Sequence, residues 1–126
     1  MSEIKGQVEL SNRLRRIATE YPKDCGRALY QEALIEQAES MARTPVLTGN
    51  LRSTHRTEQP DYSMGSISVQ ITVGDSATPY AVRIHEDLEM YHPHGQAKFL
   101  ESTLMESAPY WTQRVAARLD IRKYGL

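Results

Sequence analysis

The sequence has little cysteine and no excess of charge of one sign. Its single cysteine, Cys25, can form neither an intrachain disulfide nor a cysteine-based zinc site, which favours a reducing compartment. Lys and Arg number 15 against 16 Asp and Glu, giving a net charge of -1 at pH 7. A chain so close to neutrality lacks the electrostatic field with which histone-like proteins and repressors neutralise phosphates. The composition therefore disfavours a nucleic-acid-binding function.

Long hydrophobic runs are also missing. No apolar stretch approaches the roughly 18 residues that a membrane span requires, and residues 1–5 lack the apolar region of a signal peptide. We therefore expect a soluble protein of cytoplasmic origin that has no contact with a membrane. Aromatic residues make up only 7% of the 126 residues, with one Trp and one Phe, so the core must be modest. We expect neighbouring subunits to contribute to its stability.

Apolar spacing predicts three helical segments. Residues 1–21 and 22–43 form the first two, and a proline ends the first and opens the second. The third covers residues 97–120. It should kink near Pro109, because a proline inside a helix removes a hydrogen bond and crowds the preceding turn. Ser107 is a candidate cap for the second half of this helix.

Alternation of apolar and polar residues predicts a sheet within residues 51–85. The clearest strands are 66–73 and 80–85, which would pair as an antiparallel hairpin. The threonine-rich segment 51–58 is expected to supply a third strand to the meander. Residues 86–96 show no regular pattern and are interpreted as a long surface loop.

These elements predict one α+β domain over residues 1–126, with a small antiparallel sheet of about three strands packed against the long helix and the C-terminal helix. On the long helix, Glu32 and Glu36 are expected to lie away from the apolar face. The predicted core comprises Leu14, Ile17, Tyr30, Leu34, Met41, Val69, Ile71, Val82, Ile84, Phe99, Leu100, Leu104, Trp111 and Val115.

The motifs of common enzymes are missing. The sequence has no nucleophile elbow, no phosphate-binding glycine loop and no dinucleotide fingerprint, so we expect no catalytic residue, no cofactor and no metal. Two alternatives stay open. One is a small metal-dependent enzyme that uses His85, Glu86, His92 and His94, although zinc sites need three or four ligands on rigid elements. The other is a small binding adaptor.

A turn motif follows the long helix and precedes the predicted strands. Gly49 can adopt a positive φ, Thr48 can hydrogen-bond the turn backbone, and Leu51 can bury the start of the hairpin while Arg52 points outward. The motif comprises Pro45, Thr48, Gly49, Leu51, Arg52 and Ser53. Contacts with other subunits are expected at Arg52, His55, Arg56, Tyr62, Met64, Glu86, Leu88, Met90, Tyr91, His92 and His94.

The order of these motifs resembles the tail-completion, or neck, family of long-tailed double-stranded DNA bacteriophages. The turn motif is similar to the family's Pro-x-x-Thr-Gly-x-Leu-Arg-x-Ser run, and the resemblance covers roughly residues 25–119. The sequence departs from the family pattern in three places, at Leu47, at Asp87-Leu88 and at Lys98. The second half of the pattern is matched by Tyr80, Glu86, Phe99 and Leu100.

The resemblance implies a non-enzymatic structural protein that forms a ring, a homohexamer, at the neck or the proximal end of the tail. Such a ring would complete the tail and join it to the head connector. The implied partners are further copies of the chain, other neck proteins (connector, adaptor or stopper), and tail tube or terminator proteins. DNA would pass through without specific binding, and the protein would be part of a virion assembled in the host bacterial cytoplasm.

Overall fold

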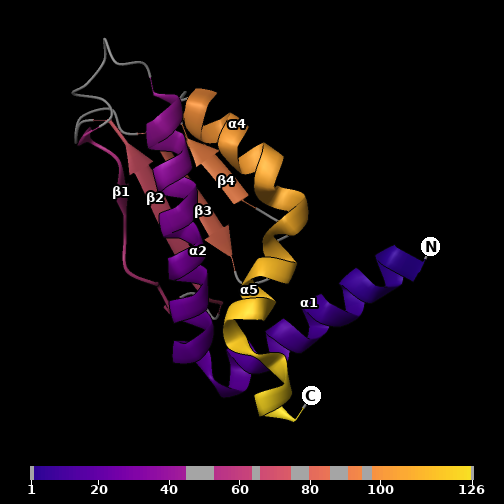
Figure 1. Ribbon diagram of the computed structural model, residues 1–126. Coiled ribbons are helices and arrows are strands. Elements are labelled where there is room, and N and C mark those ends of the chain that lie inside the picture. Colours follow the sequence, from indigo (N-terminus) through magenta and orange to yellow (C-terminus); the bar gives the residue numbers. More distant parts are fainter. Residues whose placement is uncertain are drawn as a thin grey trace.

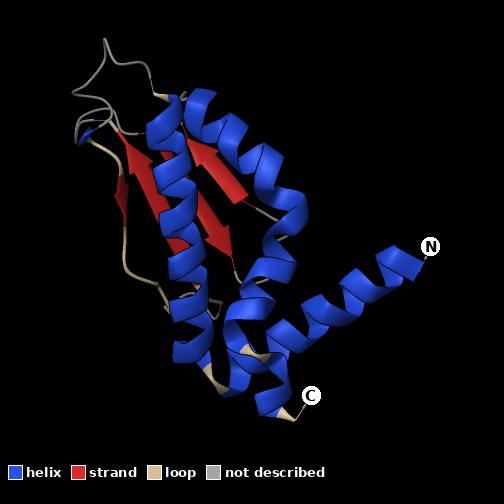
Figure 2. Cartoon of the chain, in the orientation of Figure 1, coloured by secondary structure: helices blue, strands red, loops and turns tan. Residues whose placement is uncertain are grey.

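The computed structural model describes residues 2–44, 53–63, 66–74, 80–85, 91–94 and 98–125. Helices lie on the near side in Figure 2 and the strands lie behind them, which gives a two-layer α+β arrangement. The elements are α1 (Ser2–Glu20), α2 (Pro22–Arg43), β1 (Arg56–Thr57), β2 (Ser68–Val73), β3 (Tyr80–His85), β4 (Tyr91–His94), α4 (Lys98–Ser107), η2 (Ala108–Tyr110), α5 (Trp111–Leu119) and η3 (Ile121–Tyr124).

The two N-terminal helices meet at Tyr21. Pro22 occupies the first turn of α2, where its missing N–H has no helical partner to lose. α1 crosses the lower end of α2, and its N-terminal half projects away from the rest of the molecule (Figure 1). The other half buries Leu14 and Ile17 in the core. The long helix α2 is therefore the element that contacts both α1 and the sheet.

The sheet has four antiparallel strands in the order β1-β2-β3-β4. β2 and β3 form the expected hairpin, with Ser68 opposite His85 and Val73 opposite Tyr80. The strand expected over residues 51–58 is shorter than predicted, because only the two residues of β1 pair with β2. Residue 53 is helical and residue 54 lies in a turn, so the first strand begins only at Arg56.

β4 corrects a second expectation, because residues 91–94 form a strand inside the segment 86–96 that is expected to be an irregular loop. Its sequence, Tyr-His-Pro-His, does not alternate and contains Pro93, which cannot donate to a strand ladder. β4 is an edge strand, and a proline is tolerated there when its nitrogen faces away from the neighbouring strand.

The core lies between the sheet and the helices. Most of the predicted core residues are buried in it, which confirms that part of the prediction: Leu14, Ile17, Val69, Ile71, Val82, Ile84, Leu100, Leu104, Trp111 and Val115. Tyr30 and Phe99 are partly buried and pack against this core. Met41 is only half-buried. Leu34 was predicted wrongly, because its side chain is 40% exposed.

The prediction for Leu34 failed because α2 buries a different face from the expected one. Apolar residues occur all round this helix, so their spacing does not select a side. The face that the fold buries consists of Cys25, Gly26, Ala28, Leu29, Glu32, Ala33, Glu36 and Ser40. The expectation that Glu32 and Glu36 lie away from the core is therefore wrong as well.

The C-terminal helix breaks as predicted. α4 ends at Ser107, a 3-10 turn carries Pro109, and α5 starts at Trp111 (Figure 1). Ser107 does not cap the second half, because its hydroxyl donates to the Thr103 carbonyl at 3.0 Å. After α5, the hydroxyl of Tyr124 donates to Asp24 at 3.0 Å and so ties the end of the chain to α2. Among the described helices, none is long and apolar enough to cross a membrane.

The burial of α2 predicts unequal effects of two leucine truncations on this one helix. Leu29→Ala removes a side chain that is 1% exposed, and we expect it to cost about 2–5 kcal/mol of unfolding free energy. Leu34→Ala removes a side chain that is 40% exposed and should cost about 1 kcal/mol or less. Urea unfolding of the two variants measures both values. Equal losses would contradict the assignment of the buried face.

Candidate functional site

A groove of about 700 Å³ separates α2 from the C-terminal helices α4 and α5. It combines four glutamates and three arginines with a few apolar side chains, and this concentration of charge makes it the candidate functional site. Its lining consists of Glu32, Ile35, Glu36, Glu39, Arg43, Thr103, Glu106, Ser107, Tyr110, Arg114, Ala117 and Arg118.

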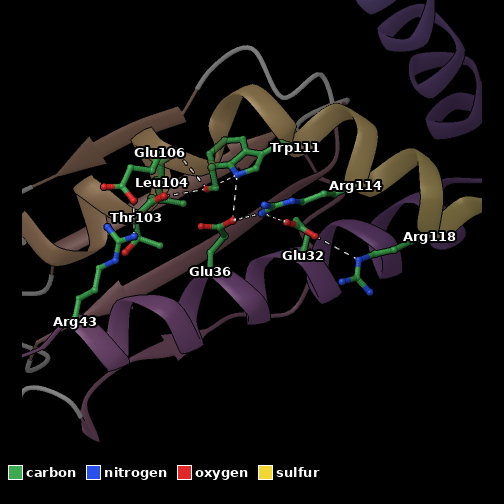
Figure 3. Close-up of polar contacts among 10 residues, drawn as sticks. Glu32, Glu36, Arg43, Thr103, Leu104, Glu106, Trp111, Arg114 and Arg118 are labelled. Atoms are coloured by element: carbon green, nitrogen blue, oxygen red, sulfur yellow. Dashed lines mark hydrogen bonds and ion pairs between the residues drawn. The ribbon is translucent and has the colours of Figure 1, made fainter.

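Two acidic residues of α2 face two arginines of α5 across the inner part of this groove (Figure 3). Arg114 Nη1 lies 3.3 Å from Glu32 Oε1 and 3.6 Å from Glu36 Oε1. Arg118 Nε lies 3.4 Å from Glu32 Oε2. Residues four apart share a helix face, so both pairs present their charges to each other. The arginines therefore supply the positive charge that lets two carboxylates be buried.

The burial of the two partners is unequal. The side chains of Glu32 and Glu36 are 3% and 1% exposed, whereas that of Arg114 is 44% exposed. A long arginine can keep its guanidinium partly in water while its stem covers apolar surface. Only the carboxylates are thus fully desolvated. Removal of an arginine would leave a buried negative charge without compensation, which is far more costly than the loss of a surface ion pair.

Trp111 connects Glu36 to the break between α4 and α5. Its indole Nε1 donates to Glu36 Oε1 at 3.2 Å and to Ser107 Oγ at 2.8 Å. Glu36 Oε2 is buried and has no hydrogen-bond partner among the described residues. One oxygen of this carboxylate is therefore held by α5, and the other is left in a desolvated position.

Burial raises the pKa of Glu36 above its ordinary value. The polar side chains of Ser107 and Trp111 act in the opposite direction, and the negative charge of Glu32 raises the pKa further. A raised pKa means that the folded protein holds the Glu36 proton more tightly than the unfolded chain does. Proton uptake at this one side chain is thus linked to the packing of α2 against α5.

The outer end of the groove carries a second ion pair. The guanidinium of Arg43 hydrogen-bonds to Glu106 and, at 3.3 Å, to Ser102 Oγ. Their hydrogen bond raises the pKa of Arg43 and lowers the pKa of Glu106. The side chain of Glu106 is 67% exposed, so this pair contributes little to stability.

Two exposed apolar side chains flank the charged groups. Ile35 is 41% exposed and Tyr110 is 55% exposed, and the guanidinium carbon of Arg114 lies 5.6 Å from the centre of the Tyr110 ring. The Glu36 side chain is shielded from solvent, so a molecule in the groove would meet the arginines and these apolar groups first. The buried ion pairs are therefore suited to fixing α5 against α2, and the exposed Ile35 and Tyr110 are suited to contact with a macromolecule.

Most of the predicted turn motif lies outside the described residues. Pro45, Thr48, Gly49, Leu51 and Arg52 all belong to this part of the chain. Only Ser53 is described, and it is exposed.

The predicted contact residues have mixed outcomes. The prediction that His55 lies at a contact surface is wrong, because this residue is only 5% exposed. Its Nε2 lies 2.8 Å from Ser40 Oγ, and its ring lies in the interior beside Phe99. Arg56 and Tyr62 are exposed, as a surface contact requires. Met64, Glu86, Leu88 and Met90 lie outside the described residues, and for Tyr91, His92 and His94 only the backbone of β4 is described.

The residues of the metal alternative are only partly described. In β4 the register sets His92 opposite Arg83 and His94 opposite Ala81, while His85 ends β3. Glu86 lies outside the described residues. Within the part of the chain that the structure describes, no group of three or more His, Cys, Asp or Glu side chains is placed to hold a metal ion.

The sequence reasoning missed the buried charge cluster of Glu32, Glu36, Arg114 and Arg118. A signal for it exists, because the two acids and the two arginines each have the four-residue spacing of one helix face. That spacing is equally typical of solvated helix surfaces. Only the packing of α2 against α5 distinguishes the two cases.

No model of a known protein family, no curated protein and no solved structure matches the chain. The function proposed below therefore depends on the residues and geometry of this chain and on the resemblance of its motifs.

The raised pKa of Glu36 predicts how one substitution changes the pH dependence of stability. A group with a raised folded-state pKa stabilises the fold at low pH, and this contribution is lost as pH rises through that pKa. Glu36→Gln keeps the shape and stays neutral. We expect its unfolding midpoint to match the wild type below the ordinary pKa of a glutamate, and to exceed it as pH rises through the raised pKa of Glu36.

The matched control is Glu39→Gln, which removes the same charge from an exposed position on the same helix. Thermal unfolding followed by circular dichroism at several pH values measures both variants. A Glu36→Gln protein that is less stable than wild type at the higher pH would show that the ion pair with Arg114 outweighs the cost of burying the charge.

Proposed function

We propose that the protein is a non-enzymatic structural subunit of the neck or proximal tail of a long-tailed bacteriophage, where it forms a ring that completes the tail and joins it to the head connector. The observation that carries the proposal is the residue order along the chain. The Pro-x-x-Thr-Gly-x-Leu-Arg-x-Ser run follows the long helix, and Tyr80, Glu86 and Phe99-Leu100 follow it in the order of the neck family.

The element order supports this proposal. α2 ends at Arg43 before the run, β2 and β3 form an antiparallel hairpin after it, and Phe99-Leu100 lies in the first turn of α4. Tyr80 and Leu100 are 4% and 0% exposed. Two of the residues that match the second half of the family pattern therefore belong to the core, where their identity affects the fold.

A ring also needs two different contact surfaces on each subunit, because cyclic contacts between like subunits are heterologous. The described surface offers two groups of exposed large apolar side chains. Leu34, Ile35, Met105 and Tyr110 lie on α2, α4 and η2, and Tyr21 and Tyr62 lie near the junction of α1 and α2. This distribution supports contacts on more than one side of the subunit.

The net charge of -1 fits a ring through which DNA passes without specific binding. The partners in this proposal are further copies of the chain, neck proteins of the connector, adaptor or stopper type, and tail tube or terminator proteins. Its location is the virion, after assembly in the cytoplasm of the bacterial host.

Deletion of the gene from the phage genome tests the proposal. We expect DNA-filled heads and separate tails in electron micrographs, because the proximal end of the tail would stay incomplete. A plasmid copy of the gene should restore joined particles, and the matched control is the same plasmid with an early stop codon. Reconstruction of the restored particles should show a ring of this chain, with six copies, between connector and tail. Normal joined virions after deletion would refute the proposal.

A further inference from the structure

The groove between α2 and the C-terminal helices carries an imbalance of charge that its own ion pairs do not remove. Four glutamates and three arginines line it, so one negative charge is left over when every group is ionised. Each of the three arginines already faces an acid of the lining in an ion pair. What the lining lacks is therefore a cation, which a ligand can supply.

The second carboxylate oxygen of Glu36 marks one place where this cation is missing. Oε2 has no hydrogen-bond partner in the described part of the chain, although the residue is only 1% exposed. In Figure 3 this oxygen points along the groove towards Arg43, away from the indole of Trp111. Burial raises the pKa of Glu36, as expected for a carboxylate whose charge is incompletely compensated. A ligand that brings an N–H group to Oε2 gains an interaction that these residues do not supply.

Glu39 offers a second open acceptor on the same side of α2. It follows Glu36 by three residues, so the two acids share a helix face. Glu39 is exposed and forms no hydrogen bond or ion pair within the residues that the structure describes. Ile35 lies one turn before it with 41% exposure, and Tyr110 of η2 lines the other side of the groove with 55% exposure. Apolar surface therefore borders the two acids.

These features favour the guanidinium of an arginine side chain as the ligand. A guanidinium is more weakly hydrated than an ammonium, so its transfer into a partly closed groove costs less. Its five N–H donors let it serve more than one carboxylate at once. The aliphatic stem of an arginine also covers apolar surface such as Ile35 while the charged group reaches the acids.

The rim of the groove favours an arginine that belongs to a polypeptide. Protein interfaces are enriched in arginine and aromatic residues, and apolar contacts around a charged centre exclude water from it. The residues on either side of an arginine in a partner can cover Ile35 and Tyr110 in this way. A free small cation would leave both side chains in water.

We propose that this groove binds an arginine side chain of a partner polypeptide, with the guanidinium on Glu36 and Glu39 and the apolar neighbours of that arginine on Ile35 and Tyr110. The guanidinium reaches Glu36 Oε2 when the side chain of Arg43, which is 34% exposed, rotates aside. Changes of side-chain rotamer are common when partners bind. The proposed contact does not require the ring, because the groove belongs to a single subunit.

Nuclear magnetic resonance of the full chain tests the inference through its only tryptophan. The indole N–H of Trp111 gives one cross-peak and donates to Glu36, so it senses a cation at that carboxylate. The probe is a blocked peptide of arginine between two leucines, and its neutral counterpart has citrulline in place of the arginine. The arginine peptide should shift the cross-peak saturably, with a dissociation constant on the order of 1 mM or lower. The citrulline peptide should bind about tenfold more weakly or less.

Variants of the groove assign the contact to particular side chains. Glu36→Gln keeps the shape and removes the buried charge, so it should weaken binding of the arginine peptide on the order of tenfold. Glu39→Gln removes an exposed charge and should weaken binding about twofold to threefold. The matched control is Glu101→Gln, which removes an exposed acid of α4 outside the lining and should bind as the wild type does. Circular dichroism checks that each variant is folded.

A shorter ligand tests whether the arginine belongs to a polypeptide. Acetyl-arginine amide carries the same guanidinium without apolar neighbours, and we expect it to bind on the order of tenfold more weakly than the peptide. Tyr110→Ala should remove much of this difference, because it takes away apolar surface that the leucines cover. Equal affinities of the two ligands for the wild-type chain would overturn the assignment to a polypeptide.

Three further results would overturn the inference. The first is a Trp111 cross-peak that does not respond to the arginine peptide. A groove already filled by another part of the chain, or by water that a guanidinium does not displace, would give this result. The second is a citrulline peptide that binds as tightly as the arginine peptide. The third is a folded Glu36→Gln variant that binds the arginine peptide as the wild type does.

Discussion

The structure depends on the burial of two carboxylates on its central helix. α2 packs against α1, the sheet, α4 and α5, so its inward face sets the relative position of every layer. Glu32 and Glu36 lie on that face, where unpaired charges would be very costly. The arrangement that brings Arg114 and Arg118 of α5 to them reduces this cost. The ion pairs thus add little net stability while strongly disfavouring any other position of α5 along α2.

The break at Pro109 serves the same requirement. The 3-10 turn at Ala108–Tyr110 interrupts the helix, so α5 does not continue straight on from α4. Trp111, the first residue of α5, then reaches Glu36 and Ser107 with a single indole N–H. The only tryptophan in the sequence therefore serves both as a large core residue and as the donor that fixes the buried acid.

The sequence allowed the α+β class, the β2–β3 hairpin and the proline break to be predicted, because each has a local cause. Alternation in Ser68–Val73 and the ring of Pro109 act within a few residues. The buried face of α2 could not be predicted in this way. The apolar Leu34 is exposed and the charged Glu36 is buried. This burial depends on α5, whose Arg114 and Arg118 lie 82 and 86 residues from Glu32 along the chain. β4 was missed for a similar reason, since its pairing with β3 compensates for a sequence that includes Pro93.

A core with few aromatic residues explains why the surface keeps so many apolar groups available. Tyr21, Tyr62 and Tyr110 are all close to half exposed, although each could have enlarged the core if it were turned inward. Tyr62 is instead fixed at the surface by the Asp61–Ser68 bridge on one side and by the missing side chain of Gly26 on the other. An exposed aromatic ring that is held this firmly loses little conformational entropy when a partner covers it. The aromatic side chains that the core leaves out are thus well suited to contact with another molecule.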